Sequence, residues 1–268
     1  MKVLKYLIIS VAVIGIGMAS WFYYPHYQIH KLKKQTVQSA SAKVSYIDFF
    51  RDTKATQINQ LALGDSVIRG FGAGQNEDLV TQFSEKLGQQ INKPVYTQNE
   101  GINGLTSGEL NELVQAGKFD EAIRHADIIT INVGGNDILH ASNKRDLTTV
   151  IQSFQQLQDH FSKNLTDISA KINRINPGAT IVFLEQYNPI PPNDSLYSLA
   201  DQLLPKWNLI IYETANQLAS SVVVETTKVI NRDNLDNLST DGIHPSPKGY
   251  AAISEQMIYQ LKHQYRNT

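Results

Sequence analysis

Five short apolar runs alternate with longer segments of helical periodicity along most of the chain. The runs have the length of buried strands and span Ile58–Leu63, Val95–Gln98, Ile128–Val133, Thr180–Leu184 and Ser221–Val224. The periodic segments predict helices over Leu79–Ile91, Ser107–Ala116, Leu147–Asn173, Leu196–Ala219 and Lys248–Gln264. Strands separated by helices favour a parallel sheet covered on both faces. The pattern therefore predicts an α/β protein with a five-stranded parallel sheet.

The amino-terminal segment shows a different pattern, a single long apolar run. Lys2 and Lys5 precede this run, which extends from Tyr6 to Tyr24. As a helix rising about 1.5 Å per residue, it is close to the roughly 30 Å thickness of the hydrocarbon core of a bilayer. The aromatic residues Trp21–Tyr24 at its end are typical of a membrane interface. We expect an uncleaved signal anchor, with a signal peptide cleaved near Gly17–Ala19 as the alternative.

Three regions follow from this pattern: an anchor or signal peptide over residues 1–30, a linker over 31–43 and a globular domain over 44–268. The polar, small residues of Gln35–Lys43 suit a tether. Lys31, Lys33 and Lys34 compete with the amino-terminal charges under the positive-inside tendency, which alone leaves the topology open. We expect the domain to lie outside the cytoplasm, held at the cell membrane or secreted if the helix is cleaved.

Composition and charge narrow the choice of partners. The chain has 268 residues, of which 41% are hydrophobic, enough for one α/β domain with a substantial core. Because 24 basic residues are balanced by 25 acidic ones, no general attraction to nucleic acid is expected, and we set nucleic acid aside as a partner. The absence of cysteine excludes disulfides, a thiolate nucleophile and Cys-ligated zinc.

Four short polar blocks lie beside the predicted strands or the last helix. They are Gly64-Asp65-Ser66, Asn103-Gly104, Gly135-Asn136-Asp137 and Asp241-Gly242-Ile243-His244. The first three each follow a strand, and in such a sheet ligands bind outside the carboxyl ends of the strands. Each block alone is typical of a turn or a helix cap. Their order along the chain indicates one active site.

The blocks contain the groups that a serine nucleophile requires. A serine hydroxyl needs a base to take its proton, and that base must be held in one tautomer. Asp241 and His244 lie three residues apart in a tight turn, a spacing that lets the carboxylate reach Nδ1 while Nε2 points toward Ser66. Asp137 and His140 have the same spacing, so spacing alone does not identify the base. We favour Asp241 and His244, because Asn136 already occupies the other loop.

Donors for an oxyanion are also present. The backbone N–H of Ser66 at a helix start, the backbone N–H of Gly104 and the side-chain amide of Asn136 can each bind negative charge on a tetrahedral intermediate. Glycine and asparagine at these places are also typical of turns with positive φ. Asp65, next to the nucleophile, is expected to hold the loop or cap the helix.

The ordered blocks resemble those of the SGNH, or GDSL-type, hydrolases, a family named for Ser, Gly, Asn and His. The resemblance extends from about Leu61 to Tyr250, although only the blocks are specific, and Val67 stands where the eponymous tetrapeptide has leucine. It implies a flavodoxin-like α/β/α sandwich and the hydrolysis of carboxylic esters, as a carboxylesterase, lipase or acetylesterase, without a metal or cofactor. It also implies the site residues: Ser66 as nucleophile, His244 as base, Asp241 as its orienting acid, and Ser66, Gly104 and Asn136 as the oxyanion hole.

Two other functions stay open at this point. A metal-dependent phosphoesterase would use Asp65, Asn136, Asp241 and His244 as hard ligands. A surface-binding module would keep the fold without turnover. We expect instead a small-molecule or envelope acyl ester as the substrate.

Two further segments are candidates for the surroundings of the Ser66 site. Gly70–Gly74 lacks the last glycine of a dinucleotide-binding loop and is interpreted as a rim of the Ser66 site. The apolar stretch Tyr187–Trp207 is either a cover for an acyl-chain groove or a loop leading to a helix that faces the core.

Overall fold

A five-stranded parallel sheet forms the centre of the molecule. The computed structural model describes residues 19–34, 44–143 and 147–266. The strands are β2 (Ile58–Gly64), β3 (Val95–Gly101), β4 (Ile128–Asn132), β5 (Thr180–Leu184) and β6 (Ser221–Val224). They lie in the order β3-β2-β4-β5-β6 and pair in parallel throughout. This strand order is the flavodoxin-like one, so the predicted fold class is confirmed.

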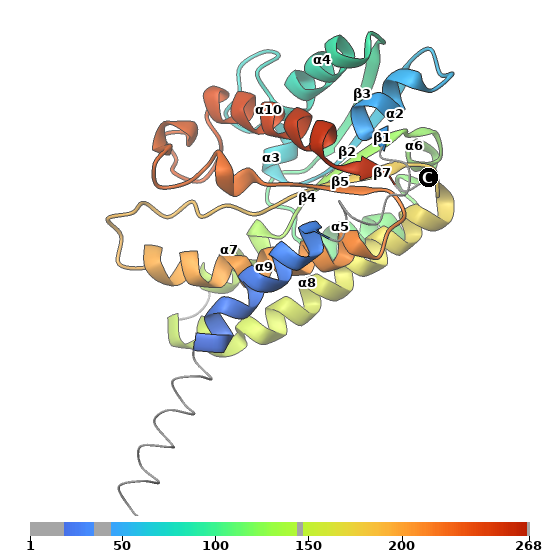
Figure 1. The fold of residues 1–268 in the computed structure, drawn as a ribbon. Coiled ribbons are helices and arrows are strands. Elements are labelled where there is room, and N and C mark those ends of the chain that lie inside the picture. Colours follow the sequence, from blue (N-terminus) through green and yellow to red (C-terminus); the bar gives the residue numbers. More distant parts are fainter. Residues whose placement is uncertain (1–18, 35–43, 144–146, 267–268) are drawn as a thin grey trace, which may run out of the picture.

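Helices cover both faces of this sheet and make the molecule three-layered (Figure 1). One face carries α2 (Tyr46–Asp52), α3 (Ser66–Arg69), α4 (Leu79–Ile91) and α10 (Pro247–His263). The other carries α5 (Ser107–Gln115), α6 (Asp120–His125), α7 (Gly135–Asn143), α8 (Leu147–Ile175) and α9 (Tyr197–Asn216). Two short strands, β1 (Val44–Ser45) and β7 (Tyr265–Arg266), pair antiparallel. Two 3₁₀ turns, η1 (Thr226–Lys228) and η2 (Leu235–Asn237), lie between β6 and α10.

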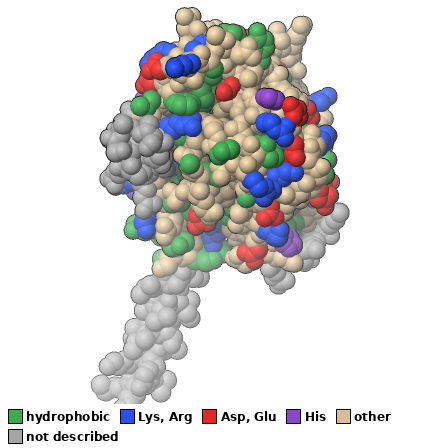
Figure 2. Space-filling view, turned by 90° about the vertical axis from the view of Figure 1, so that its right-hand side faces the viewer, with side chains coloured by type: hydrophobic (Ala, Val, Ile, Leu, Met, Phe, Trp, Pro, Cys, Tyr) green, Lys and Arg blue, Asp and Glu red, His purple; other side chains and the backbone are tan. Residues whose placement is uncertain are grey.

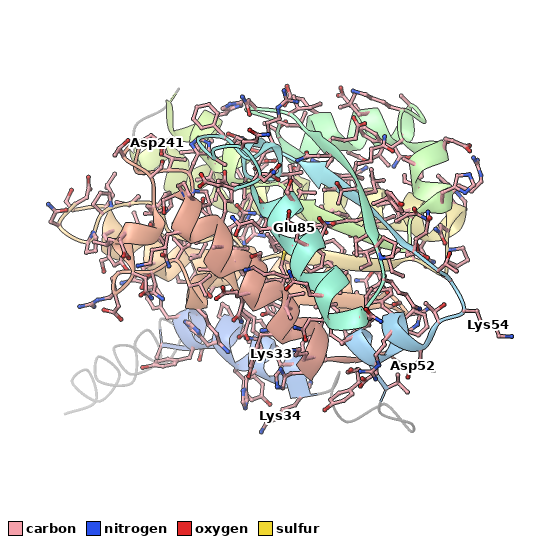
Figure 3. The ribbon with its side chains drawn as sticks, turned by 90° about the horizontal axis from the view of Figure 1, so that it is seen from above. Lys33, Lys34, Asp52, Lys54, Glu85 and Asp241 are labelled. Atoms are coloured by element: carbon pink, nitrogen blue, oxygen red, sulfur yellow. The ribbon has the colours of Figure 1, made fainter. Side chains whose placement is uncertain are left out.

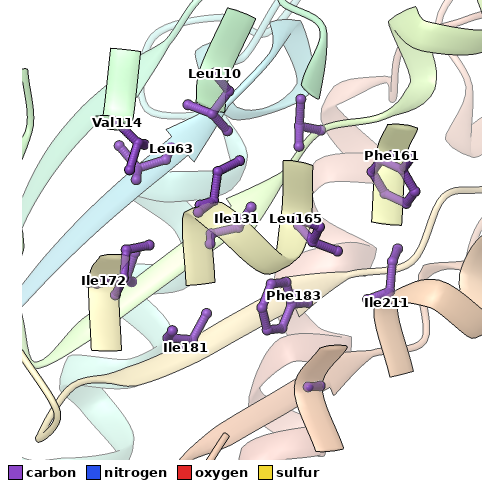
Figure 4. Packing of buried hydrophobic residues seen from close by; sticks show 14 of the residues in the cluster. Leu63, Leu110, Val114, Ile131, Phe161, Leu165, Ile172, Ile181, Phe183 and Ile211 are labelled. Carbon is purple, nitrogen blue, oxygen red and sulfur yellow. The ribbon is translucent and has the colours of Figure 1, made fainter. Parts of the chain in front are cut away.

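The hydrophobic core is divided by the sheet into two clusters. Successive side chains of a strand point to opposite faces. In β5, Ile181 and Phe183 therefore join the cluster under α5, α8 and α9, while Val182 and Leu184 join the cluster under α4 and α10. Figure 4 shows the first of these clusters, in which side chains from α5, α8 and α9 meet those of the strands. Burial on both faces explains why the central strands appear as continuous apolar runs.

The predicted strands and long helices are confirmed, with differences at their ends and in short elements. The strand predicted over Val95–Gln98 continues to Gly101, because its backbone pairs with β2 as far as Gly64 opposite Gly101. As an edge strand it exposes polar side chains, so hydrophobicity does not indicate its length. The helices α2, α6 and α7 were not predicted; each has nine residues or fewer, which is shorter than the window of about 11–18 residues in which helical periodicity is recognised.

A helix over residues 19–34 lies along α8 and α9 (Figure 1). Ile29 and Leu32 pack against the core cluster on that face. Lys33 forms an ion pair with Glu225, and its Nζ lies 5.1 Å from the ring centre of Tyr212. The helix is thus docked on the domain through apolar and charged contacts.

Residues 6–18 of the predicted membrane span, Tyr6 to Tyr24, lie outside the described residues. Residues 19–24 form the first part of the docked helix. Among the residues that are described, no helix combines the length and the apolar character needed to cross a bilayer. The division into regions 1–30, 31–43 and 44–268 stays a prediction. The docked helix crosses its first boundary, since it continues to residue 34.

Candidate active site

The predicted site residues gather at one end of the molecule, where the parallel strands end. Ser66 opens α3 directly after β2, Gly104 lies in the turn after β3, and Asn136 lies in the first turn of α7 after β4. Asp241 and His244 belong to the loop before α10. Figure 3 shows Asp241 at the end of the molecule opposite Asp52 and Lys54, which precede the amino end of β2.

The turn that carries Ser66 is tightly built. Gly64 ends β2 against β4, and a Cβ at this position would overlap the carbonyl oxygen of Asn132. The backbone N–H of Asp65 donates to that same oxygen at 3.1 Å. The Asp65 carboxylate caps α3 by accepting from the N–H of Val67 at 3.0 Å, as predicted. Both residues thus place Ser66 at the start of a helix with its hydroxyl at the strand end.

Ser66, His244 and Asp241 form a continuous hydrogen-bonded chain. His244 Nε2 lies 2.8 Å from Ser66 Oγ, and His244 Nδ1 lies 2.6 Å from Asp241 Oδ2. The other carboxylate oxygen of Asp241 accepts from the Ser239 hydroxyl at 2.6 Å and from the backbone N–H groups of Ile243 and His244 at 2.9 and 3.0 Å. One carboxylate therefore holds both the imidazole and the turn that carries it.

These contacts keep Asp241 ionised. Partial burial acts to raise the pKa of its carboxyl group, but the hydrogen bonds from Ser239, His244 and Ile243 outweigh this effect and hold the pKa well below its usual range. A charged carboxylate at this place favours the imidazole tautomer with the proton on Nδ1, which leaves Nε2 free to accept a proton.

The aromatic ring of Phe71 lies against the His244 imidazole. The ring centres of Phe71 and His244 are 4.4 Å apart at an interplanar angle of 37°. Phe71 is 45% exposed, and its carbonyl accepts from the buried Tyr250 hydroxyl at 2.9 Å. The segment interpreted as a rim thus contributes a specific contact that sequence reasoning missed. The only signal for it was an aromatic residue just after the nucleophile helix.

The loop of Gly104 and the start of α7 are joined to each other. Gly104 adopts a φ of 77°, in the left-handed region that favours glycine. Two residues earlier, the Ile102 N–H donates to the carbonyl of Gly64 at 2.9 Å. One residue later, the Leu105 carbonyl accepts from Asn136 Nδ2 at 3.1 Å. Because an amide nitrogen carries two hydrogens, Asn136 keeps a second N–H for another acceptor.

The competing Asp-x-x-His pair is used differently. Asp137 accepts two hydrogen bonds from Ser107, from its N–H at 2.9 Å and from its hydroxyl at 2.5 Å. Burial raises the pKa of the Asp137 carboxyl, against the opposing effect of these bonds. His140 is exposed. The pair that reaches Ser66 is Asp241 and His244.

The apolar stretch Tyr187–Trp207 divides between the two predicted interpretations. Trp207 is fully buried and stacks on Phe161, with ring centres 4.5 Å apart. Leu203 packs against the core, whereas Leu196 remains 39% exposed. The carboxyl-terminal part of the stretch is therefore a core-facing helix. Among the described residues no group of three or more His, Asp or Glu side chains is placed to hold a metal ion.

Comparison with known proteins identifies the family of the chain. The model of the GDSL-like lipase/acylhydrolase family matches residues 62–252, more than half of the chain. The spore germination lipase LipC of Bacillus licheniformis is 30% identical over 203 residues, which cover 73% of this chain and 92% of that protein. The uncharacterised protein YpmR of Bacillus subtilis is 23% identical over 205 residues, 75% of this chain and 80% of that protein.

A solved structure gives the same result. The lipase Lip_vut3 from a goat rumen metagenome superposes with a TM-score of 0.67 at 28% identity, covering 76% of this chain and 97% of its own. The family match, the relatives and the strand order agree with each other. The chain belongs to the GDSL-like lipase/acylhydrolase family and is a hydrolase of ester bonds.

Proposed function

We propose that the protein is a serine esterase that cleaves carboxylic acyl esters through an acyl-enzyme. The observation that carries this proposal is the hydrogen-bonded chain from Ser66 Oγ to His244 Nε2 at 2.8 Å and from His244 Nδ1 to Asp241 Oδ2 at 2.6 Å. A hydroxyl within hydrogen-bonding distance of an imidazole, itself oriented by a carboxylate, is the arrangement that activates a serine.

In the proposed reaction, Ser66 Oγ attacks the ester carbonyl while His244 takes the hydroxyl proton. Asp241 stabilises the imidazolium that forms. His244 then gives the proton to the departing alkoxide, so that the alcohol leaves and an acyl-Ser66 ester remains. A water molecule, deprotonated by His244, attacks this ester and releases the acid and the free serine.

The negative oxygen of each tetrahedral intermediate needs donors that are already in place. We assign this role to the backbone N–H groups of Ser66 and Gly104 and to the side-chain amide of Asn136. Ser66 N–H lies at the first position of α3, where helix N–H groups have no partner within the helix. Asn136 is oriented by its bond to Leu105 and retains one free N–H.

Replacement of the nucleophile tests the proposal directly. Ser66→Ala should lower kcat on a p-nitrophenyl ester by about 10³-fold or more, since no other group can form the acyl intermediate. It should also abolish labelling by a fluorophosphonate. Ser84→Ala is a matched control, because Ser84 is equally buried, at 8% exposure, but lies on α4. Wild-type turnover by Ser66→Ala would overturn the assignment.

The identity of the base is tested separately. We expect His244→Ala to lose most of the turnover, while His140→Ala, which removes an exposed histidine on α7, changes kcat by less than about twofold. The reverse order of losses would assign the base to the Asp137 pair.

The acyl group is the next question. The two relatives named as lipases support a fatty acyl ester, and the half-exposed Phe71 beside His244 offers an apolar surface for it. A series of esters from acetyl to palmitoyl, compared by kcat/KM, reports the preferred length. A steep preference for acetyl would instead indicate deacetylation of a polysaccharide or small ester.

We also propose that the enzyme acts outside the cytoplasm, attached through its amino-terminal helix. The support is the sequence pattern of Lys2, Lys5 and the apolar run to Tyr24. Retention of the full chain in alkali-washed membranes, with the domain open to protease added to intact cells, is the expected result. A soluble chain shortened near residue 19 would show that the helix is cleaved.

The phosphoesterase alternative is less compatible with the contacts. Asp65 caps α3, and Asp241 is bound on both oxygens by the His244 turn, so neither carboxylate is available as a free ligand. Activity that survives EDTA but is lost on fluorophosphonate treatment excludes this alternative. Failure of Ser66 to react with any fluorophosphonate would favour a binding module without turnover.

A further inference from the structure

The two auxiliary donors of the proposed oxyanion hole come from separate parts of the chain. Gly104 lies in the loop between β3 and α5, and Asn136 lies at the start of α7. Both must point at one oxygen atom, and donors of this kind act within a narrow distance range of about 2.7–3.1 Å. Contacts within the protein must therefore fix the distance between the Gly104 loop and the start of α7.

One direct link is a single neutral hydrogen bond, from Asn136 Nδ2 to the Leu105 carbonyl at 3.1 Å. A stronger link lies one residue further along each segment. Asp137 accepts from the N–H of Ser107 at 2.9 Å and from its hydroxyl at 2.5 Å. Hydrogen bonds to a charged acceptor are roughly twice as strong as neutral ones, so Asp137 provides most of the connection between α7 and this loop.

The donor of this link, Ser107, is itself held in place. Ser107 is fully buried and is the first residue of α5, whose amino end is also held by a capping box of Thr106 and Glu109. Asn164 of α8 donates to the Ser107 hydroxyl at 3.0 Å. A carboxylate at the amino end of a helix is stabilised by the helix dipole. Ser107 thus connects Asp137 to two helices that are rigidly packed on the sheet.

We propose that Asp137 is a positioning residue for ester hydrolysis: through Ser107 it sets the spacing between the Gly104 N–H and the Asn136 amide. This inference rests on the proposed oxyanion hole. Asp137 makes its contacts with the protein and acts on the substrate only through these donors. Removing its carboxylate lets the two donors separate, and a misplacement of about 1 Å can cost up to about 100-fold in rate.

The test compares Asp137→Ala with Asn136→Ala and with the double variant. Asp137→Ala should lower kcat by about 10- to 100-fold with KM within about twofold, because the oxyanion exists only after the substrate has bound. Asn136→Ala should cost about 100- to 1000-fold. The double variant should lose little more than Asn136→Ala alone, because both act on the same group of donors.

A control variant at Asp127 separates a loss of stability from a loss of donor positioning. Asp127 also accepts from a backbone N–H of another element, that of Asn59 in β2 at 2.8 Å, but it lies at the amino end of the sheet. Asp127→Ala should lower Tm and leave kcat unchanged. If Asp137→Ala does not fold, Asp137→Asn and Ser107→Ala, which each keep part of the link, should show smaller kcat losses with the same non-additivity.

The outcomes distinguish this inference from the proposed function. The positioning role alone would be overturned if the fold-losses in kcat of Asp137→Ala and Asn136→Ala multiply in the double variant. It would also be overturned if Asp137→Ala keeps the wild-type kcat while Asn136→Ala is impaired. Full activity in Ser66→Ala would overturn the esterase mechanism itself.

Discussion

Three carboxylates near Ser66 lie in different environments and behave differently. Asp241 is partly exposed and surrounded by donors, so its pKa is lowered. Asp65 is buried and Asp137 is half-buried, and burial raises the pKa of both carboxyl groups; the pKa of Asp65 reaches about 7, with a smaller contribution from the nearby Asp137. Asp241, whose pKa is lowered, is thus the group that orients His244, while Asp65 and Asp137 hold backbone in place.

The raised pKa of Asp65 makes a prediction about stability. An acid whose pKa is higher in the folded state loses stability as the pH rises from its unfolded value of 3.8 to its folded value of about 7. Asp65→Asn keeps a side-chain oxygen that can accept the hydrogen bond from the Val67 N–H, and it removes the titratable carboxyl group. Relative to this variant, the wild type should lose a few kcal/mol between about pH 4 and pH 7, measured by urea unfolding. Parallel pH curves for the two proteins would contradict it.

Phe71 allows a prediction about the substrate. Phe71→Ala removes the ring that contacts the His244 imidazole. About half of the surface of Phe71 is open to solvent. We expect kcat/KM to fall by about fivefold, with a larger loss for octanoyl than for acetyl esters, since ring contacts contribute about 1 kcal/mol. Phe71→Leu, which keeps an apolar side chain, should restore the chain-length preference. An equal loss for all esters would show that the ring only supports the imidazole.

At the scale of elements, regular patterns were predictable and long-range contacts were not. The buried strands and the long helices have strong periodicity, and their positions followed from it. The end of β3 depends on pairing with β2, which hydrophobicity does not encode. The duplicated Asp-x-x-His pairs were equivalent by spacing, and only the fold shows that Asp137 lies against Ser107 while Asp241 lies against His244. The contact between the tilted rings of Phe71 and His244 could likewise not be predicted, since the two residues are far apart in sequence.

The junction of β2, β4 and α3 depends on one glycine. Gly64→Ala places a Cβ on the Asn132 carbonyl, which is backbone and cannot move aside easily. We expect a loss of more than about 3 kcal/mol in the free energy of unfolding, and of activity with it. Gly178→Ala, where the new Cβ meets only ordinary contacts, should change stability by less than about 1 kcal/mol. Denaturant midpoints of the two variants, measured together, test the difference.

At the scale of the whole molecule, the helix over residues 19–34 is part of the folded body. It shares the core cluster of α8 and α9 through Ile29 and Leu32 and pairs Lys33 with Glu225. The face drawn in Figure 2 carries basic and acidic side chains interspersed, in keeping with a nearly neutral chain. No single-sign patch on that face indicates attraction to a charged polymer.

Removal of this helix should therefore weaken the domain. A chain starting at residue 35 loses the burial of two aliphatic side chains, worth about 2 kcal/mol, and should melt about 4–8 °C below one starting at residue 19. Esterase turnover per folded molecule should be equal in the two, because none of the helix contacts named above involves Ser66, His244 or Asp241. Equal melting temperatures would contradict the docking.

The docked helix has a consequence for the membrane attachment proposed above, should the chain be held there through residues before the helix. A protease cut near Gly17–Ala19 would fall before the residues that hold the helix in place, Ile29, Leu32 and Lys33. The shed enzyme would keep the same folded body as the tethered one, so a cell that cut this bond would change where the enzyme acts without changing how fast it works.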